Sequence, residues 1–250
     1  MTAVGLAVVM PLTGALAATA PAAPATPAAP SLTLLEQLQQ ALSAGGSSLS
    51  ALLEQGAGLD PALVELRRRA LLKQFPDASW TLTPGPALRD GRRTVELRVA
   101  GTHLQNGSTF RLEASQQLAL TSSSGRITGQ NVLREQSILR SGSQDLAVTL
   151  QIPDAVLTGQ RYDVDVVFDE PLNGAVVAGG LIALTTSQTK AMEPPRLELG
   201  ALGGGGLFKT VQAPYTPGEQ TWAVLLVHPK GIVTATKRVR VVSDRAQLTP

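Results

Sequence analysis

The sequence has no cysteine and only two histidines among its 250 residues. It therefore forms no disulfide, and it offers neither a thiol nucleophile nor a cysteine-ligated zinc site. Charged residues make up 16% of the chain, and the net charge of +2 is too small to indicate a nucleic acid as partner. Aromatic residues are also scarce, at 3%, whereas glycine (24) and proline (17) are plentiful. This combination is typical of a chain built from strands and turns.

The first 32 residues predict an export signal and a linker. Residues 3–17 are uncharged and apolar and end in Ala15-Leu16-Ala17, a small-x-small cleavage site, although no lysine or arginine precedes the apolar run. We expect residues 1–17 to be a signal peptide and the protein to be periplasmic or secreted. If the segment were retained instead, it could anchor the protein to the membrane, although Pro11 and the many alanines make a poor spanning helix. Residues 18–32 are a Pro/Ala linker, which stays extended and builds no core.

Helical patterns occupy residues 33–75, and a two-residue period follows. We expect helices at 33–42 (with a capping box at Thr33), 48–55 and 60–75 (with Asp60 as N-cap). Strands are predicted at 79–84, 94–104, 109–121 and 126–140, with Asn106-Gly107 as a hairpin turn. Helices followed by an antiparallel sheet with one apolar face form an α+β plan.

The block from 33 to 142, with its phrase "GSTFRLEASQQLALTSSSGRITGQNVLREQSILR", resembles the cone-shaped domains of the nuclear transport factor and ketosteroid isomerase relatives. The resemblance implies N-terminal helices on a curved antiparallel sheet, a possible homodimer through this domain, and a possible ligand pocket. The pocket face would carry Val99, Phe110, Leu112 and Gln116. Only Gln116 is polar, and an amide cannot transfer protons at useful pH. No catalytic residue is therefore predicted.

Residues 145–243 predict a second, all-β domain, followed by a tail at 244–250. Tyr162, Val164, Val166 and Phe168 alternate along one of about seven short strands, the pattern of a β-sandwich, and Asn173-Gly174 is a hairpin signal. The closing "PGEQTWAVLLVHPKGIVTATKRVRVV" resembles the last hairpin of many bacterial immunoglobulin-like domains. The resemblance implies an immunoglobulin-like β-sandwich.

Three charged or glycine-rich motifs could carry chemistry. "GGGGLFKT" (203–210) resembles a phosphate loop, but Phe208 replaces the required glycine and no helical pattern follows, so a glycine loop beside a strand, exposed for a partner, is favoured. Arg67, Arg68 and Arg69 are either a surface for an acidic partner or lipid, or the solvated face of a helix. Asp163 and Asp165 alternate on a strand and do not match the spacing of a calcium loop.

These observations favour a non-catalytic exported envelope protein that acts in protein–protein interaction or scaffolding. We expect an unidentified protein partner, no nucleic acid, no cofactor and no metal. Arg67, Arg68, Arg69 and Phe208 are the predicted partner surface. The alternative is a carrier or enzyme that binds a small apolar ligand in the pocket of the cone.

Overall fold

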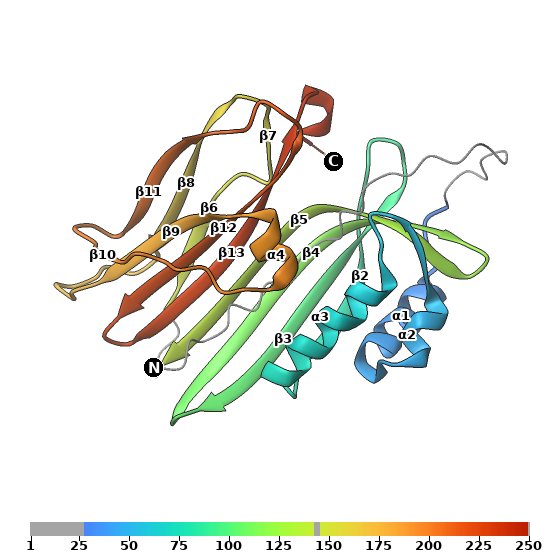
Figure 1. Ribbon diagram of the computed structural model, residues 1–250, viewed down its shortest axis with the longest axis horizontal. Helices are drawn as coiled ribbons and strands as arrows, with labels where there is room; N and C mark the ends of the chain where they lie inside the picture. The colour runs from blue at the N-terminus through green and yellow to red at the C-terminus, as the bar shows by residue number, and fades with distance from the viewer. Residues whose placement is uncertain (1–27, 143–145, 250) are drawn as a thin grey trace. The chain divides into compact units, whose positions relative to one another are not determined.

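The computed structural model describes residues 28–142 and 146–249, which divide into two compact units. The helical unit comprises residues 28–101 and 115–133, and the sandwich unit comprises 102–114 with the described residues from 134 onward. Figure 1 shows their elements. The predicted signal peptide, most of the linker and the predicted boundary after 142 lie outside the described residues. Three long strands have residues in both units: β3 (Arg93–Gln105), β4 (Ser108–Ser123) and β5 (Arg126–Gly142).

No helix in the described part of the chain combines the length and the apolar character needed to cross a membrane.

The helical unit opens with three helices: α1 (Leu32–Ala44), α2 (Ser47–Leu52) and α3 (Pro61–Gln74). The predicted capping box at Thr33 is wrong. Ser31 is the last extended residue, and its side chain caps α1 by accepting a hydrogen bond from the Leu34 amide at 3.2 Å. Asp60 caps α3 as predicted, because its carboxylate accepts hydrogen bonds from two amides of the first turn.

The helix predicted at 48–55 is cut short in the structure. α2 ends at Leu52, and the next residues form β1 (Leu53–Ala57), which pairs in parallel with β5. The Arg126 guanidinium donates a hydrogen bond of 2.7 Å to the Leu53 carbonyl, at the point where the helix ends. Sheet pairing and this bond satisfy backbone groups that would otherwise need the next helical turn. Tertiary contacts therefore override the local helical pattern.

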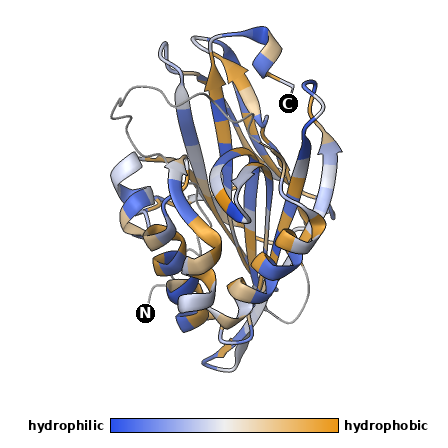
Figure 2. Ribbon diagram, turned by 90° about the vertical axis from the view of Figure 1, so that its right-hand side faces the viewer, coloured by the Kyte–Doolittle hydropathy of each residue, from blue (hydrophilic) through white to orange (hydrophobic). Residues whose placement is uncertain are grey.

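The sheet of the helical unit has the order β5-β4-β3-β2, where β2 (Ser79–Ala87) is an edge strand. α1 packs against β2, and the Gln39 side chain accepts a hydrogen bond of 2.7 Å from the Leu82 amide. Figure 2 shows that the helices carry both hydrophobic and hydrophilic residues. The apolar row of α1 is buried: Leu34, Leu35, Leu38, Ala41 and Leu42. Predicted core residues of the strands are buried as well: Val95, Val99, Leu118 and Leu120.

The sandwich unit consists of two sheets. Its larger sheet has the order β10-β9-β12-β13 with the end of β5 beside β13, and β7 pairs in parallel with β13. Its smaller sheet has the order β11-β8-β6. The bounds are β6 (Val148–Gln151), β7 (Ala155–Leu157), β8 (Arg161–Phe168), β9 (Ala178–Leu184), α4 (Thr186–Ala191), β10 (Gly200–Ala201), β11 (Gly206–Gln212), β12 (Gly218–His228), β13 (Gly231–Val242) and a 3₁₀ turn, η1 (Arg245–Gln247).

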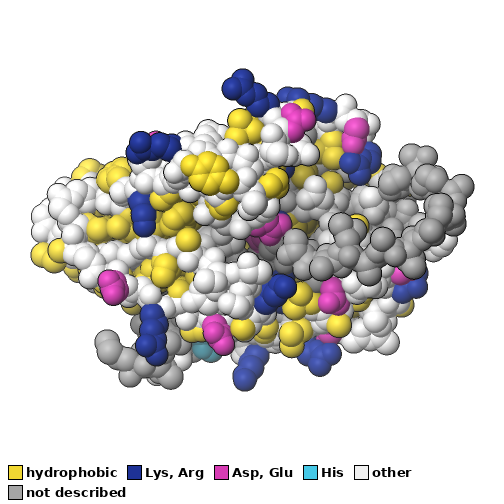
Figure 3. Space-filling view, turned by 45° about the horizontal axis from the view of Figure 1, so that its top comes forward, with side chains coloured by type: hydrophobic (Ala, Val, Ile, Leu, Met, Phe, Trp, Pro, Cys, Tyr) yellow, Lys and Arg dark blue, Asp and Glu magenta, His cyan; other side chains and the backbone are white. Residues whose placement is uncertain are grey.

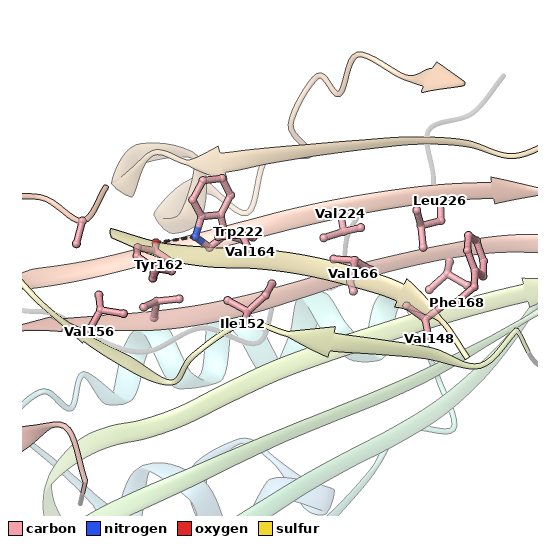
Figure 4. Close-up of a cluster of buried hydrophobic side chains, with 14 of the residues drawn as sticks. Val148, Ile152, Val156, Tyr162, Val164, Val166, Phe168, Trp222, Val224 and Leu226 are labelled. Atoms are coloured by element: carbon pink, nitrogen blue, oxygen red, sulfur yellow. Dashed lines mark hydrogen bonds between the residues drawn. The ribbon is translucent and has the colours of Figure 1, made fainter. Parts of the chain in front are cut away.

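The core of the sandwich unit contains apolar side chains of both sheets (Figure 4). The predicted alternation in β8 is confirmed, because Tyr162, Val164, Val166 and Phe168 are all buried while the residues between them face outward. β12 and β13 contribute the opposing row: Trp222, Val224, Leu226, Val233, Ala235, Val239 and Val241. A strand with one buried face and one solvated face is the pattern of an antiparallel two-layer arrangement.

Two expectations for this unit are wrong. The chain after residue 145 is not made of strands and turns alone, because Thr185 forms a capping box with Gln188 and starts α4. Asn173 and Gly174 do have the positive φ angles of a tight turn, 48° and 80°, but they do not close a hairpin. β9 pairs with β12 and β10 rather than with β8, so this turn connects the two sheets.

Candidate functional site

β11 is one of the two edge strands of the three-stranded sheet, and within residues 28–142 and 146–249 it pairs on one side only, with β8 (Figure 1). The Phe168 amide donates to the Gly205 carbonyl, and the Ala213 amide donates to the Gln160 carbonyl. In an antiparallel pair, this register turns the backbone groups of odd-numbered residues of β11 toward β8. The even-numbered residues therefore direct their N–H and C=O groups to the free edge: Gly206, Phe208, Thr210 and Gln212.

The outer face of this sheet carries Phe208, which is 65% exposed. Next to it, the Thr210 hydroxyl donates a hydrogen bond of 2.7 Å to Asp163, and Asp165 accepts a longer one of 3.3 Å from the Lys209 amide. Asp163 and Asp165 share this face, as predicted, and they tie β11 to β8. Among the described residues, no group of three or more potential metal ligands gathers.

The inner face of β11 carries Lys209 between Leu207 and Val211. The Lys209 ammonium lies 5.7 Å from the centroid of the Trp222 ring, within the range of a cation–π interaction. Trp222 itself is only 4% exposed. The lysine therefore covers the edge of the core with its side chain while its charge stays at the surface.

Trp222 takes part in a short chain of hydrogen bonds, of which Figure 4 shows the one to Tyr162. Its Nε1 donates to the Tyr162 hydroxyl at 3.0 Å, and this hydroxyl donates to Gln220 Oε1 at 2.6 Å. Burial raises the pKa of Tyr162 above its ordinary value, and the hydrogen bond from Trp222 opposes this in part. Tyr162 is therefore neutral at physiological pH and able to donate. Sequence reasoning missed this cluster, although Gln220 beside an apolar row was a usable signal.

The glycine stretch before β11 does not have the geometry of a phosphate loop. Lys209 and Thr210 lie inside a strand rather than at the start of a helix, where amides would meet a phosphate. The interpretation of this segment as a strand, with Leu207, Lys209 and Val211 on one face, is confirmed. A Cβ atom added at residues 203, 204 or 205 would meet nothing within 4 Å. At Gly206 it would overlap the Val166 carbonyl oxygen, so this glycine permits close pairing with β8.

The three arginines of α3 do not form a common surface of free cations. The Arg68 side chain is only 9% exposed, donates to both Glu65 oxygens and reaches the Leu42 carbonyl near the end of α1. Arg69 is 71% exposed and also binds Glu65, at 2.9 Å, and Arg67 is half-buried. Hydrogen bonds, with that from Arg68 the largest cause, hold the pKa of Glu65 below its ordinary value. Figure 3 shows charges of both signs spread over the face in view.

The four residues predicted to line a pocket are distributed over the two units. Val99 and Gln116 belong to the helical unit, and both are buried. Phe110 and Leu112 belong to the sandwich unit, where Leu112 is buried and Phe110 is half-buried. The ligand pocket stays a prediction.

Two buried cations of β13 were not anticipated. Lys237 forms an ion pair with Asp154, and Arg238, which projects from the opposite face, forms one with Glu219. Glu135, also buried, lies 3.9 Å from Arg238. The sequence signal for the buried Lys237 was its position in a row of β13 whose other residues are apolar. Buried charges that have partners of opposite sign are typical of structural ion pairs.

Comparison with known proteins adds one partial match. Residues 143–242 match a family described as a domain of unknown function, DUF8623. No curated protein matches the chain. The matched range covers most of the sandwich unit, including the whole of β11, so the candidate site lies inside the region of similarity.

Proposed function

We propose that this chain is a non-catalytic exported envelope protein that acts in protein–protein interaction or scaffolding, and that a protein partner binds at the free edge of β11. The free edge itself carries the proposal. Four alternate residues of β11 direct backbone groups outward, and one of them, Phe208, has an exposed side chain. An extended segment of a partner can add to such an edge as another strand.

The energetics of strand addition suit this edge. Each main-chain hydrogen bond formed with the partner contributes about 0.5–1.5 kcal/mol, and burial of an exposed aromatic ring adds to this. Other edge strands described in the same unit are shorter: β6 has four residues, β7 has three and β10 has two, against seven in β11. An edge of this length that contains no proline is a site for pairing with another chain.

The finer parts of the proposal concern fold and location. We propose a cone-like helical unit and an immunoglobulin-like sandwich unit. Helices beside an antiparallel sheet support the first, and two sheets around one apolar core support the second. Export rests on the apolar run at residues 3–17.

The test uses the full chain in its own envelope, with a photo-crosslinking amino acid at position 208. A matched control carries the same group at Val176, which is 81% exposed and lies outside β11, in the segment between β8 and β9. We expect a crosslinked partner from position 208 and none from 176. The Thr210→Pro substitution removes an outward N–H but no backbone hydrogen bond to β8, and it also removes the hydroxyl that donates to Asp163. It should abolish the crosslink. Thr210→Val also loses the hydroxyl but keeps the N–H, and it should preserve the crosslink.

A thermal unfolding curve for Thr210→Pro verifies that the variant is folded. The proposed site is excluded if folded Thr210→Pro crosslinks as well as the wild type, or if position 176 captures the same partner equally.

A further inference from the structure

Lys209, at the free edge of β11, carries a positive charge that no described carboxylate neutralises. Lys209 is exposed, and within the described residues it has no carboxylate at ion-pair distance. Its contact with the Trp222 ring is a cation–π interaction and leaves the positive charge uncompensated. The nearby carboxylates of Asp163 and Asp165 project from the other face of the sheet and accept hydrogen bonds there. The inner row of the edge is therefore positive.

An added strand would meet this row in a defined way. Because Phe208 and Thr210 direct their backbone groups outward, they would form the hydrogen-bonded pairs with an antiparallel partner. Lys209 would then lie in a non-hydrogen-bonded pair, where the two Cα atoms are about 4.5 Å apart and side chains are closest. The partner residue opposite Lys209 shares its face, and the next residue of the partner lies opposite Phe208 on the outer face.

A second copy of β11 fits this edge poorly. The antiparallel register that pairs all seven residues of β11 with a second copy sets Gly206 opposite Gln212 and places the two Lys209 side chains directly opposite each other. Like charges directly opposite are destabilising. Shifted registers avoid this contact but leave part of β11 unpaired.

We infer that the β11 edge selects an extended partner segment in which an acidic residue adjoins an apolar or aromatic residue. The acidic side chain pairs with Lys209 on the inner face, and its apolar neighbour packs against Phe208 on the outer face. This inference rests on the proposed function, because it specifies the chemistry of the strand that binds there.

The test uses synthetic eight-residue peptides rich in valine and threonine, with aspartate, asparagine or lysine at one central position. Affinities are measured by isothermal titration calorimetry on the full chain, and amide hydrogen exchange at Phe208 and Thr210 locates the bound peptide. From typical cross-strand pair energies, we expect the aspartate peptide to bind about threefold better than the asparagine peptide and on the order of tenfold better than the lysine peptide. The order should reverse in Lys209→Glu and disappear in Lys209→Met. Lys190→Glu makes the same charge change on α4 and should leave the order unchanged.

The outcomes separate the inference from the proposed function. Edge amides protected equally by all three peptides would overturn the acidic preference and leave strand addition intact. Charge discrimination that persists in Lys209→Met would also overturn it, because another group would then be responsible. Protection of the edge amides without peptide, rising with protein concentration, would identify a second copy as the occupant. If no peptide protects the edge while the crosslink from position 208 still depends on the Thr210 N–H, this partner chemistry is wrong although the site is right.

Discussion

Replacement of Gly206 by alanine should destabilise the sandwich unit, whereas the same change at Gly204 or Gly205 should not. A Cβ atom at Gly206 would overlap the Val166 carbonyl oxygen and approach the Val167 Cα to 3.0 Å. Both obstacles are backbone atoms of β8, so β11 must move away at its first residue. Overpacking of this kind costs about 1–3 kcal/mol, and the weakened ladder adds up to about 1 kcal/mol. Alanine also lowers the conformational entropy of the unfolded chain, which stabilises the folded state by about 0.4–1 kcal/mol.

The expected net loss is therefore about 2 kcal/mol for Gly206→Ala. For a chain of this size, this corresponds to a melting temperature lower by about 4–8 °C. Gly204→Ala and Gly205→Ala should stay within about 0.5 kcal/mol of the wild type, because an added methyl group meets nothing within 4 Å. Urea and thermal unfolding of the three variants measure the difference. Equal stability of all three would refute the close pairing of Gly206 with β8, and a large loss at Gly204 would refute the view of the loop as a simple connection.

Two further predictions concern one interaction in each unit: the Arg68–Glu65 ion pair of the helical unit and the Tyr162–Trp222 hydrogen bond of the sandwich unit. Arg68→Met should destabilise by about 1–3 kcal/mol in urea unfolding, whereas the exposed Arg69→Met should cost about 0.5 kcal/mol or less. The pKa of Glu65 is lowered mainly by Arg68. The stabilisation that this ion pair gives the folded state is therefore complete above pH ~4.3 and is lost as the pH falls through the folded-state pKa of Glu65. The difference in stability between Arg68→Met and the wild type should shrink accordingly in acid. Tyr162→Phe should cost about 1–3 kcal/mol at pH 7, because it leaves the buried Trp222 N–H without its acceptor. Since burial raises the pKa of Tyr162, wild-type stability should fall as the pH rises past about 10, and a Tyr162→Phe deficit that is the same at pH 7 and 11 would contradict this origin.

Local signals predicted the parts of the fold that depend on a few neighbouring residues. Asn106 and Gly107 have the positive φ angles, 52° and 77°, that the hairpin signal requires. Asp60 caps its helix, and β8 alternates as expected. Pairing between distant segments was not predictable in the same way. Residues 53–55 have a helical pattern but join a sheet through β5, more than 70 residues further along the chain, and nothing local encodes that partner.

The candidate site was predictable to the same extent. The two faces of β11 follow from the alternation of Leu207, Phe208 and Lys209 in the sequence. The position of Lys209 over Trp222 does not, because it requires the two sheets to pack face to face. The free edge also depends on strand order, since any strand in the middle of a sheet would have both sides paired. What makes β11 a candidate is therefore its place in the topology rather than its composition.

Lys209 can oppose pairing of β11 with a second copy of the chain and still leave the edge able to bind a different partner. An open edge attracts other copies of the same chain, and natural sheets discourage this by shortening the edge, by proline or by an inward-pointing charge. β6 and β10 are short, and β2, the edge strand of the helical unit, contains Pro84 and Pro86. β11 is neither short nor interrupted by proline, and its only charged residue is Lys209 on the inner face. A lysine there opposes self-pairing by repulsion, but unlike proline it leaves the backbone able to bond. The charge that repels a second copy of β11 can therefore attract a strand that carries a carboxylate, so the same residue disfavours one partner and favours another.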